Sequence, residues 1–598
     1  MNALPRWTTL APLLAALAAC GHARSPAATG ATGTAATPAA AALLAPQPAA
    51  TFARFAVAAD HPEASRAGAE VLAAGGNAAD AAAAVMLALG VVSPASSGLG
   101  GGGFALYYRA RDRTVTFLDF REKAPAATTP TMLARPPSGG PDAGAPPRAM
   151  GPTVGVPGEP RGIEELLRRF GSSIERARVV EPAARLAEEG FTPSEHMAML
   201  SQRFVGALRR DPLGQTWVPD GADGIRAGVT LRNPALARTL RTFAAEGARP
   251  FYEGPLAEEI VRSARAIGSV LTADDLRGYQ VTERAPLEGT RYGHRWVTAP
   301  PESAGGYTLL ASLSLMERWV PASNAAPDEA DVLHALAESW RGPFLDRARY
   351  FGDPDFVRVP VDALLAPARV AARAAVFDPA HARPSMAYDL PLPSGPATAP
   401  AAVPAGTGTS HLCVVDAEGN VASVTTTVNI PFGAGVSVGG FWLNDELDDF
   451  TDPAAPPGPT PVPNGSANLP APGRRPVSTM SPTIVFDDDL PSLCVGGSGG
   501  TRIVTSVTQA AWRAVVLHAP VGEAVAHPRI HQAATPDTLS FEAATPEAVV
   551  AALRARGHTV EPLRYGAIVQ AIRIVRTPAG VTLEAASDPR KGGRPAGL

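Results

Sequence analysis

Apolar residues recur at helical spacing where the folded body of the chain begins, near Phe52. Pro62–Ala74 is the first such run, and a glycine pair ends it. Asn77 then stands where an N-cap is expected, so a second helix is predicted from there to Leu89. Asp80 falls in its first turn, where the helix dipole favours an acidic side chain. The pattern therefore predicts two consecutive helices at the start of the fold.

Strand patterns lie on both sides of a long helical stretch. Phe104–Glu122 predicts two strands around a turn at Arg111–Arg113, and residues 160–265 follow a mostly helical pattern. After Thr409 two further hairpins are predicted, and the glycine-rich turn 496–500 leads into a helix. Because strand pairs and helices occupy separate blocks, we predict an α+β fold of packed sheets with covering helices, not a doubly wound parallel sheet.

Composition and charge exclude several classes of protein. The chain has 598 residues, of which 45% are hydrophobic and 18% charged, so it is globular rather than disordered. The net charge is only −4, and no basic run or zinc-finger spacing is present, so no nucleic-acid partner is expected. The 11 histidines are scattered and no cluster has metal-ligand spacing, so neither a metal nor a cofactor is expected.

The N-terminal segment reads as an export signal. Arg6 precedes an apolar stretch that is too short to remain as a membrane-spanning helix, and the stretch ends in Leu17-Ala18-Ala19-Cys20. This ending resembles a bacterial lipobox, in which the cysteine becomes the lipidated first residue; the alternative is a plain signal peptide cut at another small residue. Residues 21–51 are rich in Ala, Gly, Thr and Pro and predict a flexible tether. We expect an exported protein, periplasmic or at the cell surface, held to the membrane only through a lipid on Cys20.

Two other features are predicted to be structural. Cys413 and Cys494 lie in apolar, strand-like runs, and we expect buried free thiols. Gly98, Gly100 and Gly103 match a dinucleotide-binding glycine pattern, but the run follows a helix and precedes a strand, the reverse of the required context.

Gly408-Thr409 is a candidate site of self-cleavage. A threonine hydroxyl is a weak nucleophile unless a base lies beside it, and a chain that begins with Thr supplies that base as its own α-amine. Such a threonine must first be released by a cut before it. Gly408 has no side chain, so a hydroxyl can approach its carbonyl group, and the preceding loop is polar and built of small residues. Taken alone, Gly-Thr-Ser before a strand is more often an ordinary turn.

The residues around Thr409 resemble the catalytic subunit of γ-glutamyltransferases. The matching segments run in family order over nearly the whole chain after about residue 55; they are Ser96–Phe104, Leu118–Pro125, Val156–Gly158, Asp275-Leu276, Pro300-Pro301, Thr409–His411, Val415-Asp416, Thr425–Asn429, Leu443–Phe450, Arg475–Thr483 and Gly496–Arg502. The resemblance implies an Ntn-hydrolase αββα sandwich. It also implies self-cleavage into a large subunit, 52–408, and a small catalytic subunit, 409–598, which together form a heterodimer.

The resemblance also implies a role for each site residue. Thr409 is the expected nucleophile, Thr427 its hydrogen-bonding partner, and Gly499 and Gly500 the donors of backbone N–H groups to the oxyanion. The α-carboxylate of the substrate is expected at Arg121, Ser478 and Thr479, and its ammonium group at Asn429, Glu446 and Asp449. Asp445 and Asp448 are expected on a solvated face. The family usually has Ser-Ser at 478–479, so Thr479 adds a methyl group there.

The implied activity is cleavage of γ-glutamyl amide bonds. Glutathione or a similar compound would donate the γ-glutamyl group to Thr409, and water, an amino acid or a peptide would accept it. One alternative is a cephalosporin (glutaryl) acylase or a poly-γ-glutamate processing enzyme. In many family members the segment that corresponds to Asp452–Arg474 covers the pocket with an aromatic residue, and no aromatic residue is present here. The other alternative is a non-catalytic surface lipoprotein.

Overall fold

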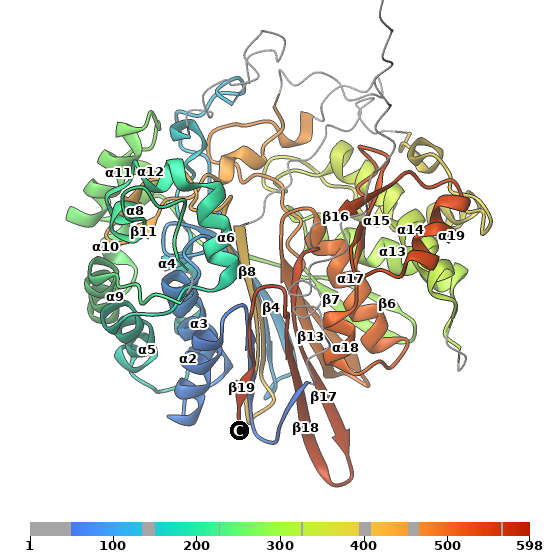
Figure 1. Ribbon diagram of the computed structural model, residues 1–598, viewed down its shortest axis with the longest axis horizontal. Helices are drawn as coiled ribbons and strands as arrows, with labels where there is room; N and C mark the ends of the chain where they lie inside the picture. Colours follow the sequence, from blue (N-terminus) through green and yellow to red (C-terminus); the bar gives the residue numbers. More distant parts are fainter. Residues whose placement is uncertain are drawn as a thin grey trace, which may run out of the picture.

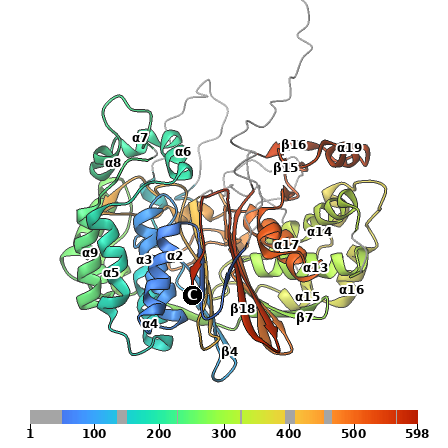
Figure 2. The same cartoon turned by 60° about the horizontal axis from the view of Figure 1, so that its bottom comes forward.

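The computed structural model describes residues 49–133, 150–226, 228–323, 327–393, 408–452, 466–563 and 566–598. Two antiparallel sheets of seven strands each face one another in the centre of the molecule. Helices coloured blue to green cover one outer face, and most helices coloured yellow-green to red cover the other (Figure 1). The turned view in Figure 2 shows the same division. The expected four-layer α+β sandwich is therefore confirmed.

The sheet that contains Thr409 has the strand order β19-β2-β8-β9-β3-β4-β5, and every neighbouring pair is antiparallel. In chain order its strands are β2 (Ala56–Ala59), β3 (Gly102–Arg109), β4 (Thr114–Asp119), β5 (Thr282–Arg284), β8 (Gly408–Val415), β9 (Val421–Asn429) and β19 (Ala596–Gly597). β8 and β9 lie at the middle of this sheet and are buried along their whole length.

The second sheet has the order β1-β18-β17-β13-β12-β7-β6 and is also antiparallel throughout. Its strands are β1 (Ala50–Phe52), β6 (Leu287–Arg291), β7 (His294–Thr298), β12 (Thr483–Asp487), β13 (Leu490–Ser498), β17 (Ile568–Thr577) and β18 (Gly580–Ser587). Its β13 packs against β8 and β9, so the centres of the two sheets are in direct contact.

The helices form two outer layers. On the Thr409-containing sheet the layer is built from α2 (Pro62–Ala73), α3 (Ala78–Val92), α4 (Glu159–Phe170), α5 (Arg176–Glu189), α9 (Pro234–Glu246), α10 (Arg249–Tyr252), α11 (Pro255–Ala266) and α12 (Ala273–Arg277). On the second sheet it is built from α13 (Gly305–Trp319), α14 (Glu329–Tyr350), α16 (Pro367–Ala374), α17 (Arg502–Val515), α18 (Val521–Ala526) and α19 (Glu547–Ala555).

Shorter elements connect these layers. They are the helices α6 (Glu195–Arg203), α7 (Val205–Leu208), α8 (Pro212–Trp217) and α15 (Val361–Leu364), the 3-10 turns η1 (Gly151–Thr153), η2 (Ser385–Tyr388), η3 (Glu446–Asp449) and η4 (Ser466–Asn468), and the strands β10 (Ser437–Val438), β11 (Phe441–Trp442), β14 (Ile530–His531), β15 (Leu539–Glu542) and β16 (Val560–Leu563). The pair β15–β16 is parallel.

Helix α3 is central to its layer because all of its residues are buried. Its predicted start is confirmed: the Asn77 side chain accepts hydrogen bonds from the backbone of Ala79 and Asp80, and Asp80 accepts one from the Asn77 backbone. Its alanine-rich sequence allows it to lie flat on β8 and β9. The helix therefore supports the two strands that carry Thr409 and Thr427.

Both sheets contain strands from before and from after the Gly408–Thr409 bond. β8 and β9 follow the bond in sequence, yet they lie between β2 and β3, which precede it. In the second sheet β12 pairs with β7 across the same division. The predicted segments 52–408 and 409–598 are thus parts of one continuous fold rather than separate domains.

Some predictions concern the chain ends and loops. Signal segment 1–20, Cys20 and most of the tether 21–51 lie outside the described residues, as do 453–465 of the segment Asp452–Arg474. The tether prediction extends slightly too far, because Ala50 and Thr51 pair with β18 as an edge strand. Across the described ranges, none of the helices has the length and apolar character needed to cross a membrane.

Candidate active site

Thr409 lies at the start of β8, with its side chain almost completely buried. The pairing of β8 with β9 changes register between Gly408 and Thr409, so Gly408 lies opposite Asn429 and Thr409 opposite Thr427. Such an irregularity changes the direction of the chain at one point of a ladder. Here the irregularity lies at the predicted cleavage bond, which is intact in the structure.

Two threonine hydroxyl groups converge on the Gly408 carbonyl oxygen. Thr409 Oγ1 donates to it over 2.7 Å and Thr427 Oγ1 over 2.8 Å, and the two hydroxyl oxygens are 3.2 Å apart. The backbone N–H of Asn429 donates to Thr427 Oγ1 over 2.8 Å, which holds that hydroxyl in place. The carbonyl group is therefore polarised, and the Thr409 hydroxyl lies beside it.

There is no room for a side chain at Gly408. A Cβ atom there would lie 2.8 Å from the Asn429 carbonyl oxygen and 3.0 Å from that of Ala95. The same reason accounts for the run Gly100–Gly103, because a Cβ at Gly101 would collide with the Thr427 carbonyl oxygen. These glycines let neighbouring backbone segments approach the site closely, which is a structural role and not nucleotide binding.

The turn between β13 and α17 lines another side of the space around Thr409. Gly499 and Gly500 have φ angles of 133° and 62°, which favour glycine. Thr479 Oγ1 donates to the Gly500 carbonyl oxygen over 3.0 Å, so the hydroxyl at this position links the predicted carboxylate-binding segment to the predicted oxyanion turn. Ser478 Oγ accepts a hydrogen bond from the Met480 backbone over 3.1 Å.

One pocket brings together nearly all of the predicted site residues. It is lined by Thr409, Thr427, Asn429, Arg121, Glu446, Asp449, Ser478, Thr479 and Gly500, and also by Arg347, Met480, Thr501 and Ile503. Gly499 lines an adjacent pocket instead, together with Lys591. The predicted nucleophile therefore shares one pocket with charged groups of both signs.

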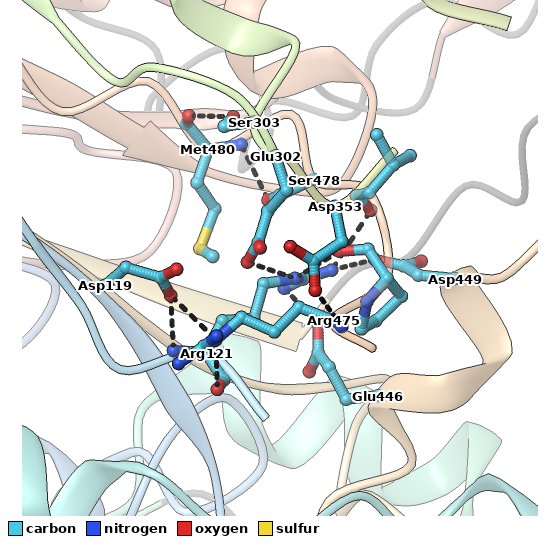
Figure 3. Close-up of polar contacts among 12 residues, drawn as sticks. Asp119, Arg121, Glu302, Ser303, Asp353, Glu446, Asp449, Arg475, Ser478 and Met480 are labelled. Atoms are coloured by element: carbon cyan, nitrogen blue, oxygen red, sulfur yellow. Dashed lines mark hydrogen bonds and ion pairs between the residues drawn. The ribbon is translucent and has the colours of Figure 1, made fainter. Parts of the chain in front are cut away.

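Arg121 is the centre of the charged end of this pocket. It is fully buried and forms ion pairs with Glu446 and with Asp449, the latter over 2.7 Å. Figure 3 shows Arg121 and Arg475 among five carboxylates, those of Asp119, Glu302, Asp353, Glu446 and Asp449. Burial alone would lower the pKa of Arg121, but the carboxylates of Glu446 and Asp449 raise it above its ordinary value, so this arginine is always charged. Both Arg121 and the neighbouring Glu122 are buried, so Arg121 does not belong to a surface salt bridge.

Glu446 is a buried acid whose ionisation depends on its partners. Burial raises its pKa to about 7, although the adjacent Arg121 favours the charged form. A small change of pH near neutrality therefore changes the charge that this end of the pocket presents to a cation.

The expectation of a solvated face for Asp445 is wrong. Asp445 is completely buried; its carboxylate accepts the backbone N–H of Ile430 over 3.1 Å, and its carbonyl oxygen accepts the Asn429 side-chain amide over 3.2 Å. Burial raises the pKa of this carboxyl group well above its ordinary value. Asp445 therefore orients Asn429. Asp448 is half-buried rather than fully exposed.

Two residues at the site were not predicted from the sequence. Arg347 of α14 lines the pocket and is 6% exposed. Lys591, close to the C-terminus, is buried; its Nζ donates to Asp60 over 2.6 Å, to the Thr409 carbonyl oxygen over 2.8 Å and to Ser96 over 3.1 Å. Neither residue has a local sequence signal: Arg347 is one of several charged residues on α14, and no motif marks Lys591.

A cluster of potential metal ligands outside the pocket was also not predicted from the sequence. His334, Glu338 and His558 come within ligating distance of one another, although His558 is far away in sequence. Most of their polar atoms already have partners: the histidines contact each other over 2.8 Å, and Glu338 accepts hydrogen bonds from Arg341 and Tyr388 over 2.7 Å each. His558 Nδ1 is buried and has no hydrogen-bond partner among the described residues. The expected free, buried state of Cys413 and Cys494 is confirmed.

Known proteins resemble this chain over most of its length. Residues 64–598 match the family described as γ-glutamyltranspeptidase. The glutathione hydrolase proenzyme of Pseudomonas aeruginosa is 36% identical over 521 residues, which is 85% of this chain and 88% of that protein. The corresponding proenzyme of Escherichia coli is 34% identical over 509 residues, 84% of each chain.

Solved structures give the same result for the fold. The crystal structure of a cephalosporin acylase from Bacillus halodurans superimposes with a TM-score of 0.74 at 25% identity, covering 92% of this chain and 97% of that one. Likeness in fold and in sequence thus extends over both the helical N-terminal part and the segment after Thr409. The chain belongs to the γ-glutamyltranspeptidase family, whose members are enzymes with the Ntn-hydrolase fold.

Proposed function

We propose that the chain cuts itself between Gly408 and Thr409 and then uses Thr409 to cleave γ-glutamyl amide bonds. The observation that carries this proposal is the position of the Thr409 hydroxyl, which contacts the Gly408 carbonyl and faces a pocket lined by acids and arginines. This pocket matches a small zwitterionic group next to a nucleophile.

The first reaction is self-cleavage. Thr409 Oγ1 attacks the Gly408 carbonyl carbon, the peptide C–N bond breaks, and the acyl group of Gly408 moves to the hydroxyl oxygen as an ester. Water then hydrolyses that ester, which frees the Thr409 hydroxyl and leaves its nitrogen as an α-amine. Thr427, which donates to the same carbonyl oxygen, stabilises the negative charge that develops there.

The second reaction is turnover. The new α-amine of Thr409 accepts the hydroxyl proton while Oγ1 attacks the γ-carbonyl carbon of the donor. The amine of the donor leaves with a proton, and a γ-glutamyl ester remains on Thr409. Water or the amino group of an amino acid or peptide then takes the γ-glutamyl group. The backbone N–H groups at Gly499 and Gly500 are the proposed donors to the oxyanion.

The charged end of the pocket supports a γ-glutamyl donor over the glutaryl alternative. A γ-glutamyl group carries an ammonium and a carboxylate, and Glu446, Asp449 and the amide oxygen of Asn429 suit the ammonium. A glutaryl group has no ammonium group and therefore cannot make these contacts. The similarity to the cephalosporin acylase structure is therefore evidence for a shared fold rather than for a shared substrate.

The test uses Thr409→Ala and Thr409→Ser. Thr409→Ala should remain a single chain and release no p-nitroaniline from γ-glutamyl-p-nitroanilide, because it has neither the hydroxyl nor the cut. Thr409→Ser keeps the hydroxyl and should cut itself and retain measurable activity. Two fragments from the alanine variant on a denaturing gel would refute self-cleavage by Thr409.

We further propose that the protein is exported and anchored through Cys20. This rests on the signal-like segment 1–20 and its lipobox-like end. A labelled fatty acid should be incorporated into the wild-type protein and not into Cys20→Ala. Equal labelling of both proteins, or recovery of unlabelled wild-type protein in the soluble fraction, would reject the anchor.

A further inference from the structure

Three buried side chains that the reaction at Thr409 does not use form a cluster of potential metal ligands. His334 and Glu338 lie one turn apart on α14, and His558 follows α19, which packs beside α14 (Figure 1). One nitrogen or oxygen atom from each of the three lies within 4.8 Å of those of the other two. Because two side chains four positions apart share one face of a helix, α14 directs both toward His558.

The hydrogen bonds of His334 leave one of its ring nitrogens with a bare lone pair. Its Nε2 lies 2.8 Å from the Asp378 carbonyl oxygen, which can only accept, so Nε2 carries the proton. Burial lowers the pKa of this histidine, so the ring is neutral and Nδ1 is unprotonated. This Nδ1 faces His558 Nε2 over 2.8 Å. A backbone carbonyl that accepts the other ring N–H is a usual partner of a metal-binding histidine, because it fixes the tautomer and the ring orientation.

His558 is a neutral ring with one unsatisfied nitrogen. Burial lowers its pKa to about 3, and its Nδ1 has no hydrogen-bond partner among the described residues. In the contact with His334 its proton lies on Nε2; when Nε2 binds a metal ion instead, the proton moves to Nδ1. Two nitrogen ligands of a tetrahedral zinc ion lie about 3.3 Å apart, so the two rings need to separate by only about 0.5 Å.

Glu338 supplies a carboxylate that is already held in one orientation. Its Oε1 accepts Arg341 Nε over 2.7 Å, and its Oε2 accepts the Tyr388 hydroxyl over 2.7 Å and the Arg383 backbone N–H over 3.1 Å. A carboxylate has about four lone-pair sites, so one site remains on Oε1 for a further partner.

The charged groups around the cluster leave an excess of negative charge. Arg341 pairs with both Glu338 and Asp537, and Arg556 pairs with Asp331. Three carboxylates therefore face two guanidinium groups, while both histidines are neutral. A cation bound at the cluster has a compensating charge.

We propose that His334 Nδ1, His558 Nε2 and Glu338 bind one divalent transition-metal ion, for which zinc is the best match. Two imidazole nitrogens and a carboxylate oxygen are a donor set that zinc takes in proteins, with water at the fourth position. The two histidines are 224 positions apart, so spacing along the sequence gives no sign of the site.

This ion has a structural role. None of its ligands lines the pocket of Thr409. His334 and Glu338 precede the Gly408–Thr409 bond and His558 follows it, so the ion joins the two sides of the proposed cut. The site does not depend on the proposed activity, because all three ligands are already in place in the uncut chain.

The experiment adds Zn²⁺ to wild-type protein that has been treated with a chelator and dialysed, and measures bound zinc by equilibrium dialysis. We expect about one ion per chain and a melting temperature that rises with zinc concentration, because an ion that binds only the folded state stabilises it. His558→Gln and His334→Gln should each weaken binding by more than about 100-fold, since even the outer partners of metal ligands contribute about 10- to 100-fold. The uncut variant Thr409→Ala should bind zinc as the wild type does, which separates this site from the proposed function.

His381→Gln is the matched control. His381 is an exposed histidine that contacts Asp378 and lies outside the cluster, so its replacement should leave zinc binding unchanged. A melting temperature close to that of metal-free wild type shows that a variant is folded; if one cluster variant does not fold, the other carries the test. A wild type that binds no stoichiometric zinc, cluster variants that bind it as tightly as the wild type, or an equal loss in His381→Gln would overturn the assignment.

Discussion

At the scale of single residues, the site depends on hydroxyl groups held by backbone contacts. Thr427 is the clearest case, since it accepts from the Asn429 backbone and donates to the Gly408 carbonyl oxygen. This pair of bonds fixes the direction of its proton, so Thr427 acts as a ready donor to the charge that forms during self-cleavage.

Thr427→Val keeps the shape of the side chain and removes that donor. We expect self-cleavage to slow by about 10²–10³-fold, the usual cost of losing one oxyanion donor. The rate at which the single chain disappears on denaturing gels measures this. Thr427→Ser should restore most of the rate, and a valine variant that matured at the wild-type rate would remove Thr427 from the mechanism.

Glu446 makes binding depend on pH. Its pKa of about 7 means that it becomes an anion as pH rises from 6 to 8, so the affinity for the ammonium group of the donor should rise over the same interval. The Ki of glutamine, as a competitor of γ-glutamyl-p-nitroanilide hydrolysis, should fall by about tenfold between these values. Ki is a better readout than the maximal rate, because the α-amine of Thr409 also titrates in this region.

Glu446→Gln is the matched control. The amide cannot ionise, so the Ki of glutamine should become nearly independent of pH between 6 and 8, and weaker than that of the wild type at pH 8. If the Ki of glutamine changed with pH to the same extent in both proteins, the titrating group would not be Glu446.

At the scale of elements, the C-terminal segment holds β8, the strand that carries Thr409, in place. Lys591 connects Asp60, at the end of β2, to the carbonyl group of Thr409 on β8. Lys591→Met would leave the buried Asp60 carboxylate without its charged partner, which costs about 3–5 kcal/mol in comparable buried pairs. We expect a lower melting temperature together with slower maturation.

The double variant Lys591→Met with Asp60→Asn tests whether the charge is the cause. It removes both charges and should recover much of the lost stability. If the lysine variant alone melted at the wild-type temperature, the ion pair would have no structural importance.

Local signals in the sequence predicted some elements well. The helices α2 and α3 were found because a capping residue and a glycine pair mark their ends, and the β3–β4 hairpin because its turn interrupts an apolar pattern. The site residues after Thr409 were found through the family resemblance. Asp445 and Arg347 were not, because their burial is decided by segments distant in sequence, such as the contact of Asp445 with Asn429 and the packing of α14.

At the scale of the whole molecule, the cleavage bond lies inside a fold that is already complete. β8 pairs with β2 on one side and with β9 on the other, and β9 pairs with β3, so strands from before and after the cut share one sheet. Cutting one peptide bond removes none of these contacts. The two products should therefore stay together.

This association can be measured directly. The mature protein should elute as one species on size exclusion under native conditions and separate into two fragments only in denaturant. A matched run of Thr409→Ala should give the same native elution and a single band in denaturant. Fragments that separated without denaturant would contradict the shared sheets.

The central claim concerns the bond before Thr409. Intact-mass measurement of active wild-type protein should give two chains, and the smaller should correspond to 409–598 with a free threonine at its N-terminus. An enzyme that was fully active toward γ-glutamyl-p-nitroanilide while its Gly408–Thr409 bond remained whole would contradict the account.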